Sequence, residues 1–131
     1  MAISRNLLLH LLSLAFAVAI AVALIEPVPL PLENATQGMT FPIDKLVHFA
    51  LFLVAAVPWR RSLAVLGVAS PGVAVVVAAA AYGGLLEVAQ GIWTLRDPEF
   101  LDMAAGALGA LVTVGILKVI AMRGRGHIAA E

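Results

Sequence analysis

Residues 79–102, AAAYGGLLEVAQGIWTLRDPEFLD, decide the fold because they place polar side chains at the ends of apolar helices. Glu87 and Gln90 lie within the first apolar run. Arg96 lies in the polar break that follows, and Asp102 lies in the second run. A carboxylate within a membrane span costs about 2.5–3.5 kcal/mol on insertion scales, so such a residue marks a functional site by default. The stretch therefore predicts two membrane helices that share a polar site.

The composition of the whole chain is that of a membrane protein. Of the 131 residues, 63% are hydrophobic and 12% are charged, whereas soluble domains have about 45–50% apolar and about 25% charged residues. Eight basic residues balance eight acidic ones. With no basic stripe and few aromatic residues, the chain is not expected to bind nucleic acid. Cysteine is absent, which excludes disulfides, thiolate metal ligands and cysteine nucleophiles.

Four apolar segments predict a single all-α domain, an integral membrane bundle of four transmembrane helices. A span needs about 20 predominantly apolar residues, and the expected helices cover residues 7–25, 42–59, 73–93 and 98–122. The first of these segments could be mistaken for a signal peptide. It is longer than the roughly 7–15 residues of a typical signal-peptide core, so we expect it to be retained as a helix.

Helix-start and packing signals support these boundaries. Asp97 suits an N-cap and Pro98 suits the first helical position of the last segment. Small residues that allow helices to approach closely lie in the third and fourth segments. They are Gly83, Gly84, Gly106, Gly109 and Ala110.

The distribution of basic residues predicts the orientation of the bundle. Cytoplasmic loops of membrane proteins carry an excess of Lys and Arg. Three basic clusters fall on one side of the predicted spans: Arg5; Arg60 and Arg61; and Lys118, Arg123 and Arg125. We therefore expect a multi-pass protein of the bacterial inner membrane with both termini in the cytoplasm, and with residues 26–43 and 94–99 outside.

This orientation brings polar side chains from three helices to one depth. At about 1.5 Å per residue, His48, Glu87 and Asp102 each lie about 6–10 Å below the outer boundary. The alternative is that these groups only hold the helices together, as polar side chains do in membrane bundles. We predict a ligand site formed by Asp44, Lys45, His48, Glu87, Gln90, Arg96 and Asp102. The lone His10 is instead expected to be a hydrogen-bonded interior residue or a group at a helix end.

The order and spacing of these residues resemble those of the VanZ-like membrane proteins. The resemblance covers roughly residues 42–112 and is carried by Asp44-Lys45-Leu46-Val47-His48-Phe49, Gly83-xxx-Glu87-xx-Gln90, Arg96, and Asp102 with Gly106 and Gly109. The family often has an asparagine where this chain has Gly106, which argues against a role that needs an amide there. The resemblance implies a small bacterial inner-membrane protein of the cell envelope, some of whose relatives are linked to reduced susceptibility to the antibiotic teicoplanin.

Three functions remain open at this point. In the first, the site binds membrane lipids or lipid-linked envelope precursors, with Lys45 and Arg96 contacting anionic oxygens of the head group. In the second, the chain is a non-catalytic accessory subunit of a larger membrane complex. In the third, it is an enzyme in which Glu87 and His48 act as an acid/base pair on a lipid-linked substrate. No nucleophile supports the enzyme, because Ser62 and Ser70 lie on the cytoplasmic side, so a binding role is favoured.

A metal ion is a further alternative at three of these residues. His48, Glu87 and Asp102 offer imidazole and carboxylate groups, which suit a divalent ion. No HxxxE-type signature accompanies them, however. The sequence therefore predicts neither a metal nor another cofactor.

Overall fold

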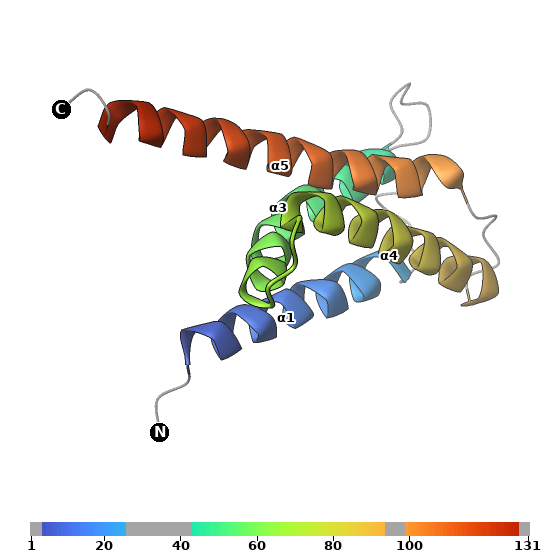
Figure 1. Cartoon of the computed structure of the whole chain (residues 1–131). Coiled ribbons are helices and arrows are strands. Elements are labelled where there is room, and N and C mark those ends of the chain that lie inside the picture. Colours follow the sequence, from blue (N-terminus) through green and yellow to red (C-terminus); the bar gives the residue numbers. More distant parts are fainter. Residues whose placement is uncertain (1–3, 26–42, 94–98, 129–131) are drawn as a thin grey trace.

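The computed structural model describes residues 4–25, 43–93 and 99–128, with no description of the side chains of 125–128. These residues form four helices: α1 (Arg5–Ile25), α3 (Ile43–Val65), α4 (Pro71–Trp93) and α5 (Phe100–Ile128). Each helix is long and apolar enough to cross a membrane. The prediction of an all-α four-helix bundle is confirmed, and the described residues include no strand (Figure 1).

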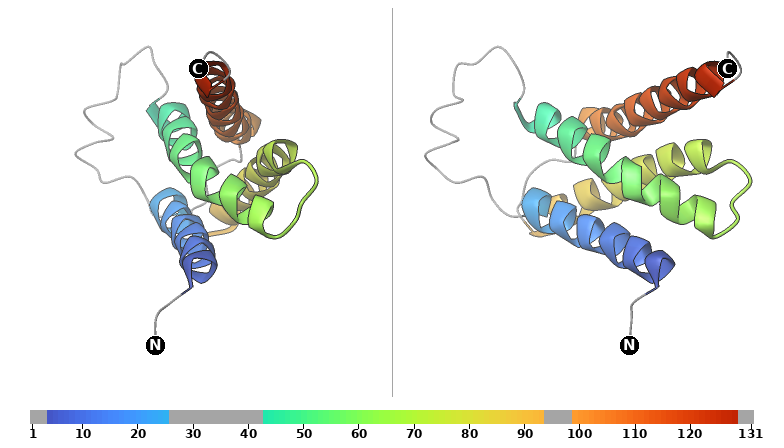
Figure 2. Two further views of the ribbon diagram at one scale, coloured as in Figure 1. Left: turned by 60° about the vertical axis from the view of Figure 1, so that its left-hand side comes forward. Right: turned by 90° about the vertical axis from the view of Figure 1, so that its left-hand side faces the viewer.

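Helix α3 lies at the centre of the bundle and packs against the other three helices. Helices α1 and α5 lie on opposite sides of the α3–α4 pair (Figure 2). The C-terminal ends of α1 and α4 and the N-terminal ends of α3 and α5 gather at the same end of the bundle (Figure 1). We call this end the junction, because residues that are far apart in the sequence meet there.

Helix α1 is attached to α3 and α4 through one face. Ile20 and Leu24 are buried on this face. Trp59 of α3 donates from Nε1 to the carbonyl oxygen of Ser13 (2.9 Å), and the hydroxyl of Tyr82 on α4 donates to the carbonyl oxygen of Ala17 (2.6 Å). These contacts are three, four or seven residues apart along α1, so they lie on one side of the helix.

The hydrogen bond expected for His10 is present at the other end of this face. His10 Nδ1 lies 2.5 Å from Oγ of Ser62, which joins α1 to α3. Deeper in the bundle, the rings of Phe52, Trp59 and Tyr82 pack against one another with centroids 5.8–6.2 Å apart. Phe52 is fully buried.

Helices α3 and α5 approach closely because glycines line the contact. A Cβ on Gly109 would lie 2.3 Å from the carbonyl oxygen of Phe49, and a Cβ on Gly106 would lie 2.9 Å from the ring of Phe52. Thr113, farther along the same face of α5, donates from its hydroxyl to the carbonyl oxygen of Leu53 (2.6 Å). The small residues noted in the sequence therefore serve helix packing.

Helix α3 extends beyond its predicted end near Trp59 and continues to Val65. Pro58 lacks an N–H group and so omits one helical hydrogen bond, but Trp59 and Ser62 attach the following turn to α1. The helix ends in a Schellman motif in which the N–H of Val68 donates to Leu63 O and that of Gly67 donates to Ala64 O, both at 3.1 Å. Gly67 adopts the left-handed conformation (φ 78°) that this motif requires.

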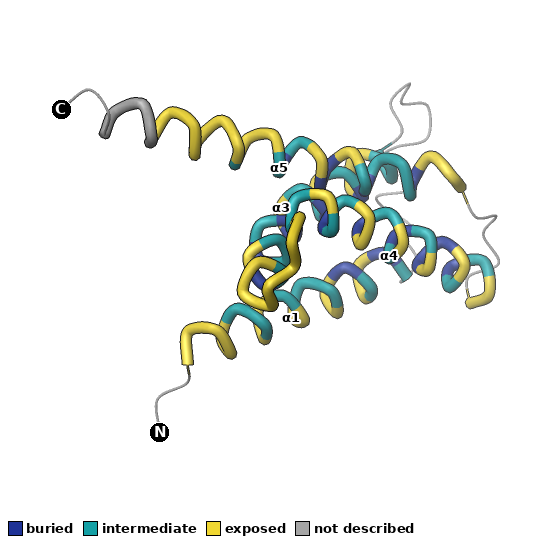
Figure 3. Tube along the Cα trace, in the orientation of Figure 1, coloured by how far each residue is buried: buried dark blue, intermediate teal, exposed yellow. Residues whose placement is uncertain are grey.

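The other helix boundaries also differ from the predicted ones. Helix α4 begins at Pro71, with the carbonyl of Ser70 accepting from the N–H of Ala74 (2.9 Å). Helix α5 begins at Phe100 and extends to Ile128 rather than ending near Met122. The predicted start at Asp97 and Pro98 lies outside the described residues. The C-terminal half of α5 projects beyond the bundle, and its residues up to Gly124 are largely exposed (Figure 3).

Candidate functional site: a buried polar cluster at the junction

A histidine and a glutamate from adjacent helices face each other below the junction. His48 on α3 and Glu87 on α4 are 3% and 6% exposed. Nε2 of His48 lies 3.2 Å from Oε1 of Glu87, but neither atom has a hydrogen-bond partner among the described residues. The other ring nitrogen, Nδ1, lies 3.0 Å from the backbone carbonyl oxygen of Asp44, one turn earlier on α3. His48 and Glu87 therefore lie close together, as the sequence predicted.

A lysine in the first turns of α3 forms ion pairs with carboxylates from α3 and from the start of α5. Nζ of Lys45 lies 3.0 Å from Oδ1 of Asp102, 3.2 Å from Oδ2 of Asp44 and 2.5 Å from Oε2 of Glu99. Asp102 is almost completely buried, with 2% of its surface exposed. Lys45 is therefore already surrounded by anions, and its charge is not available to bind an anionic ligand unless one of these contacts opens.

Glu99 belongs to the cluster although it was not among the predicted site residues. Its backbone N–H donates to Oε2 of Glu87 (2.9 Å), while its own carboxylate contacts Lys45. Glu99 thus connects α3, α4 and the start of α5. Its position three residues before Asp102 was the available signal, because residues three apart at a helix start lie on neighbouring positions of one face.

Two other predicted site residues have different environments. The side chain of Gln90 is buried and donates from Nε2 to the carbonyl oxygen of Leu24, which connects α4 to α1. Arg96 lies outside the described residues. The residues that the structure brings together are Asp44, Lys45, His48, Glu87, Glu99 and Asp102.

The charges of this polar cluster do not balance. The carboxylates are those of Asp44, Glu87, Glu99 and Asp102, and the basic groups in contact with them within the described part of the chain include Lys45 and His48. Even with His48 protonated, negative charge is in excess among these six residues. Buried charge is costly unless it is paired. The cluster is therefore better suited to bind a cationic or hydroxyl-bearing group than an anionic one.

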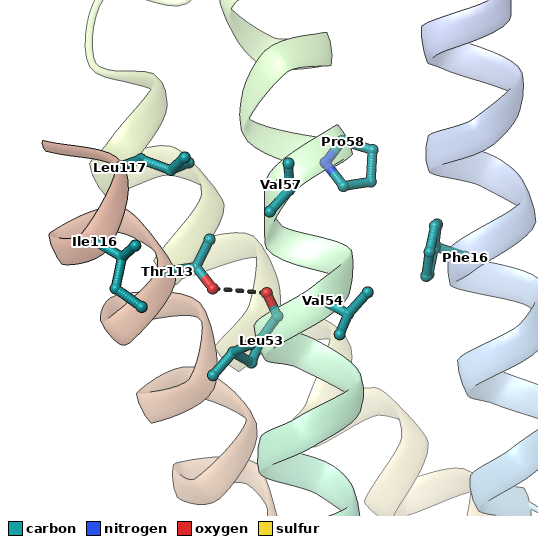
Figure 4. Close-up of a pocket in the computed structure, with 8 residues that line it drawn as sticks. All are labelled: Phe16, Leu53, Val54, Val57, Pro58, Thr113, Ile116 and Leu117. Carbon is teal, nitrogen blue, oxygen red and sulfur yellow. Dashed lines mark hydrogen bonds between the residues drawn. The ribbon is translucent and has the colours of Figure 1, made fainter. Parts of the chain in front are cut away.

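Two grooves in the bundle surface lie elsewhere and are lined almost entirely by apolar groups. A groove of about 430 Å³ is bounded by Phe16 of α1, by α3 from Leu53 to Pro58, and by Thr113, Ile116 and Leu117 of α5 (Figure 4). The hydroxyl of Thr113 bonds to Leu53 there, so it is not free for a ligand. A second groove of about 380 Å³ lies between α4 and α5. Neither groove is lined by a member of the polar cluster.

Comparisons with protein-family models, with curated proteins and with solved structures find nothing that matches this chain. The resemblance to the VanZ-like proteins therefore stays a prediction from the motif.

Proposed function

We propose that this chain is a multi-pass protein of the bacterial inner membrane that binds the head group of an envelope lipid at the polar cluster. The observation that supports this most is the placement of six ionisable residues at one end of a bundle of four helices that are each long and apolar enough to cross a membrane. Polar and ionisable residues at membrane depth are costly and mark binding sites by default. The order of the polar landmarks in the VanZ-like proteins agrees with this proposal.

The degree of exposure within the cluster provides a route from the surface to its buried part. The side chain of Glu99 is 49% exposed and that of Asp44 is 28% exposed, whereas that of Asp102 is 3% exposed. An incoming head group meets the first two carboxylates before it reaches the buried residues. This order favours a ligand that enters from the end of the bundle and not from the side.

The chemistry of the exposed part selects the kind of head group. Carboxylates accept hydrogen bonds from ammonium and hydroxyl groups. Lys45 is already paired with three carboxylates, so Arg96 is the better candidate for a phosphate. We therefore infer a head group with a phosphate beside an amine or sugar hydroxyls, as in an ethanolamine phospholipid or an amino-sugar precursor.

Binding by variants of the full chain tests this function. The chain is purified into phosphatidylcholine nanodiscs and titrated with short-chain phosphatidylethanolamine, with short-chain phosphatidylglycerol and with a lipid-linked amino-sugar precursor. We expect Glu99→Gln and Arg96→Ala to weaken binding of the first or third probe at least fivefold. Arg61→Ala is the matched control for Arg96→Ala, because Arg61 is exposed in the last turns of α3, at the opposite end of this helix from the cluster. Equal binding by all variants would contradict the proposal.

The proposed orientation has a separate test. We place both termini in the cytoplasm and the junction at the outer surface, because the basic clusters fall at the opposite end of the helices. The chain has no cysteine, so single cysteines report without background. We expect a membrane-impermeant maleimide to label Gly38→Cys but not Val68→Cys in intact spheroplasts. The reverse pattern would contradict the orientation.

The exposed half of α5 favours a second function, that of a non-catalytic subunit in a larger membrane complex. Val119, Ile120 and Met122 are exposed there. Co-purification of a stoichiometric membrane protein, lost when this half of α5 is truncated, would support a subunit role. Recovery of free monomers only would oppose it.

A further inference from the structure

The hydrogen bonding of His48 fixes which of its ring nitrogens can bind a ligand. Nδ1 lies 3.0 Å from the backbone carbonyl oxygen of Asp44. A carbonyl oxygen only accepts hydrogen bonds, so Nδ1 carries the hydrogen and donates. In a neutral imidazole the lone pair then lies on Nε2. Histidines that bind metals through one nitrogen almost always donate the other N–H to a carbonyl or carboxylate in this way.

The atom that Nε2 faces is also an acceptor. Oε1 of Glu87 lies 3.2 Å away, and neither atom has a hydrogen-bond partner among the described residues. Two buried acceptors at this distance repel unless a positive charge lies between them. Either a proton or a metal ion can supply that charge, and the third neighbouring group favours the metal ion.

That third group is the carboxylate of Asp102. A ring nitrogen of His48, a carboxylate oxygen of Glu87 and one of Asp102 all lie within 4.8 Å of one another. The three residues are 3%, 6% and 2% exposed, respectively. Two ligands that are each about 2.1 Å from a tetrahedral zinc ion lie about 3.4 Å apart, close to the observed 3.2 Å between Nε2 and Oε1. We propose that His48, Glu87 and Asp102 bind a divalent transition-metal ion such as zinc.

The surrounding residues hold these three side chains as an outer shell does in metalloproteins. The carbonyl of Asp44 orients His48, the N–H of Glu99 holds Oε2 of Glu87 at 2.9 Å, and Lys45 contacts Oδ1 of Asp102 at 3.0 Å. Such partners are needed for tight metal binding. A divalent ion also offsets the excess of negative charge in the cluster. This site does not depend on lipid binding, since its ligands lie in the buried half of the cluster.

No short spacing in the sequence joins the three ligands, so the sequence alone predicts no metal site. His48, Glu87 and Asp102 come from α3, α4 and α5, respectively. Only the packing of these helices brings the donor atoms together. The ligand set of one imidazole and two carboxylates leaves a fourth position for water or for an oxygen of a ligand.

Metal binding by the full chain in detergent, without added lipid, tests the inference. The protein carries a tag without histidine and is titrated with Zn²⁺ by calorimetry and with Co²⁺ by visible absorption. We expect one ion per chain, and at least tenfold weaker binding in His48→Asn and in Glu87→Gln. His10→Asn and His127→Asn are the matched controls and are expected to bind like the wild type.

Two results would overturn the site: less than half an equivalent of zinc on the wild type, or equal affinity in His48→Asn and the wild type. The first would leave a proton as the charge between Nε2 and Oε1. If His48→Asn loses helix content by circular dichroism, its weaker binding could come from unfolding. In that case X-ray absorption spectroscopy of zinc bound to the wild type identifies the ligands of the metal directly. One imidazole among oxygen ligands supports the site, and two imidazoles or none refute it.

Discussion

Lys45 Nζ lies 3.0 Å from Oδ1 of Asp102, and this ion pair joins the first turns of α3 and α5 where the glycine-lined contact between these helices begins. Asp102 is buried at 2% exposure, so its charge depends on neighbouring groups for compensation. The pair makes the polar cluster part of the helix packing as well as a candidate site. A substitution in the cluster can therefore lower the stability of the fold, weaken ligand binding, or do both.

Replacing Lys45 tests this dependence. Lys45→Met leaves Asp102 buried next to other carboxylates, and breaking a buried pair by removing one partner costs about 3–5 kcal/mol. We expect a loss of about 3 kcal/mol in equilibrium unfolding in mixed detergent micelles. Lys118→Met is the control, because Lys118 is exposed on α5, and it should change stability little. Equal losses in the two variants would refute the role of the pair.

The contact between α3 and α5 predicts opposite effects for two glycines on one helix. Gly109→Ala places a methyl group 2.3 Å from the carbonyl oxygen of Phe49, where only a shift of the backbone can relieve the clash. Overpacking of this kind costs about 1–3 kcal/mol. Gly115 has no neighbour within 4 Å, so Gly115→Ala should be neutral or stabilise the helix by up to about 1 kcal/mol. The same unfolding assay compares the two, and loss at both positions would argue against a tight α3–α5 contact.

The end of α3 makes a prediction that is independent of packing. Gly67 has φ 78°, and a Cβ added there would have no neighbouring atom within 4 Å. Gly67→Ala should therefore destabilise the protein by about 1–2 kcal/mol through backbone strain alone. Gly124→Ala provides the control, because that glycine also has free space but lies within a helix. Stability equal to that of the wild type for Gly67→Ala would contradict the Schellman motif.

The attachment of α1 depends on hydrogen bonds to its backbone. Tyr82→Phe removes the 2.6 Å bond to the carbonyl of Ala17 and should cost about 0.5–1.5 kcal/mol. The hydroxyl of Ser13 bonds within α1 itself, to Leu9 O at 2.8 Å, so Ser13→Ala should leave the attachment unchanged. Unfolding of both variants checks the prediction. A larger loss for Ser13→Ala than for Tyr82→Phe would show that α1 is held differently.

Hydropathy was enough to predict the helices but not all of their ends. The predicted end of α3 near Trp59 rested on Trp59 itself and on the two arginines that follow, because an interfacial aromatic residue followed by basic residues usually marks a membrane boundary. Tertiary contacts prevailed there, because Trp59 and Ser62 bond to α1 and stabilise the turn beyond the proline. Such contacts between helices far apart in the sequence leave no local signal.

The candidate site was predicted in its position but not in its internal pairing. Depth along each helix was enough to bring His48, Glu87 and Asp102 together. Depth along a helix does not determine in which direction around the helix axis a side chain projects, and so which neighbouring helix it contacts. Gln90, three residues after Glu87, therefore bonds to α1 instead of facing His48. For the same reason, the sequence did not reveal that carboxylates surround Lys45.

The most direct test of the metal-binding cluster is the stability that zinc adds to the wild type and to Glu87→Gln. A ligand that binds only the folded state at about 100 times its dissociation constant adds about 2.7 kcal/mol to the free energy of unfolding. We predict a gain of that size for the wild type and a gain of at most about 1.4 kcal/mol for Glu87→Gln, whose binding is at least tenfold weaker, measured by equilibrium unfolding in mixed micelles with and without zinc. Equal gains in both proteins, or no gain in the wild type, would contradict a metal site formed by His48, Glu87 and Asp102.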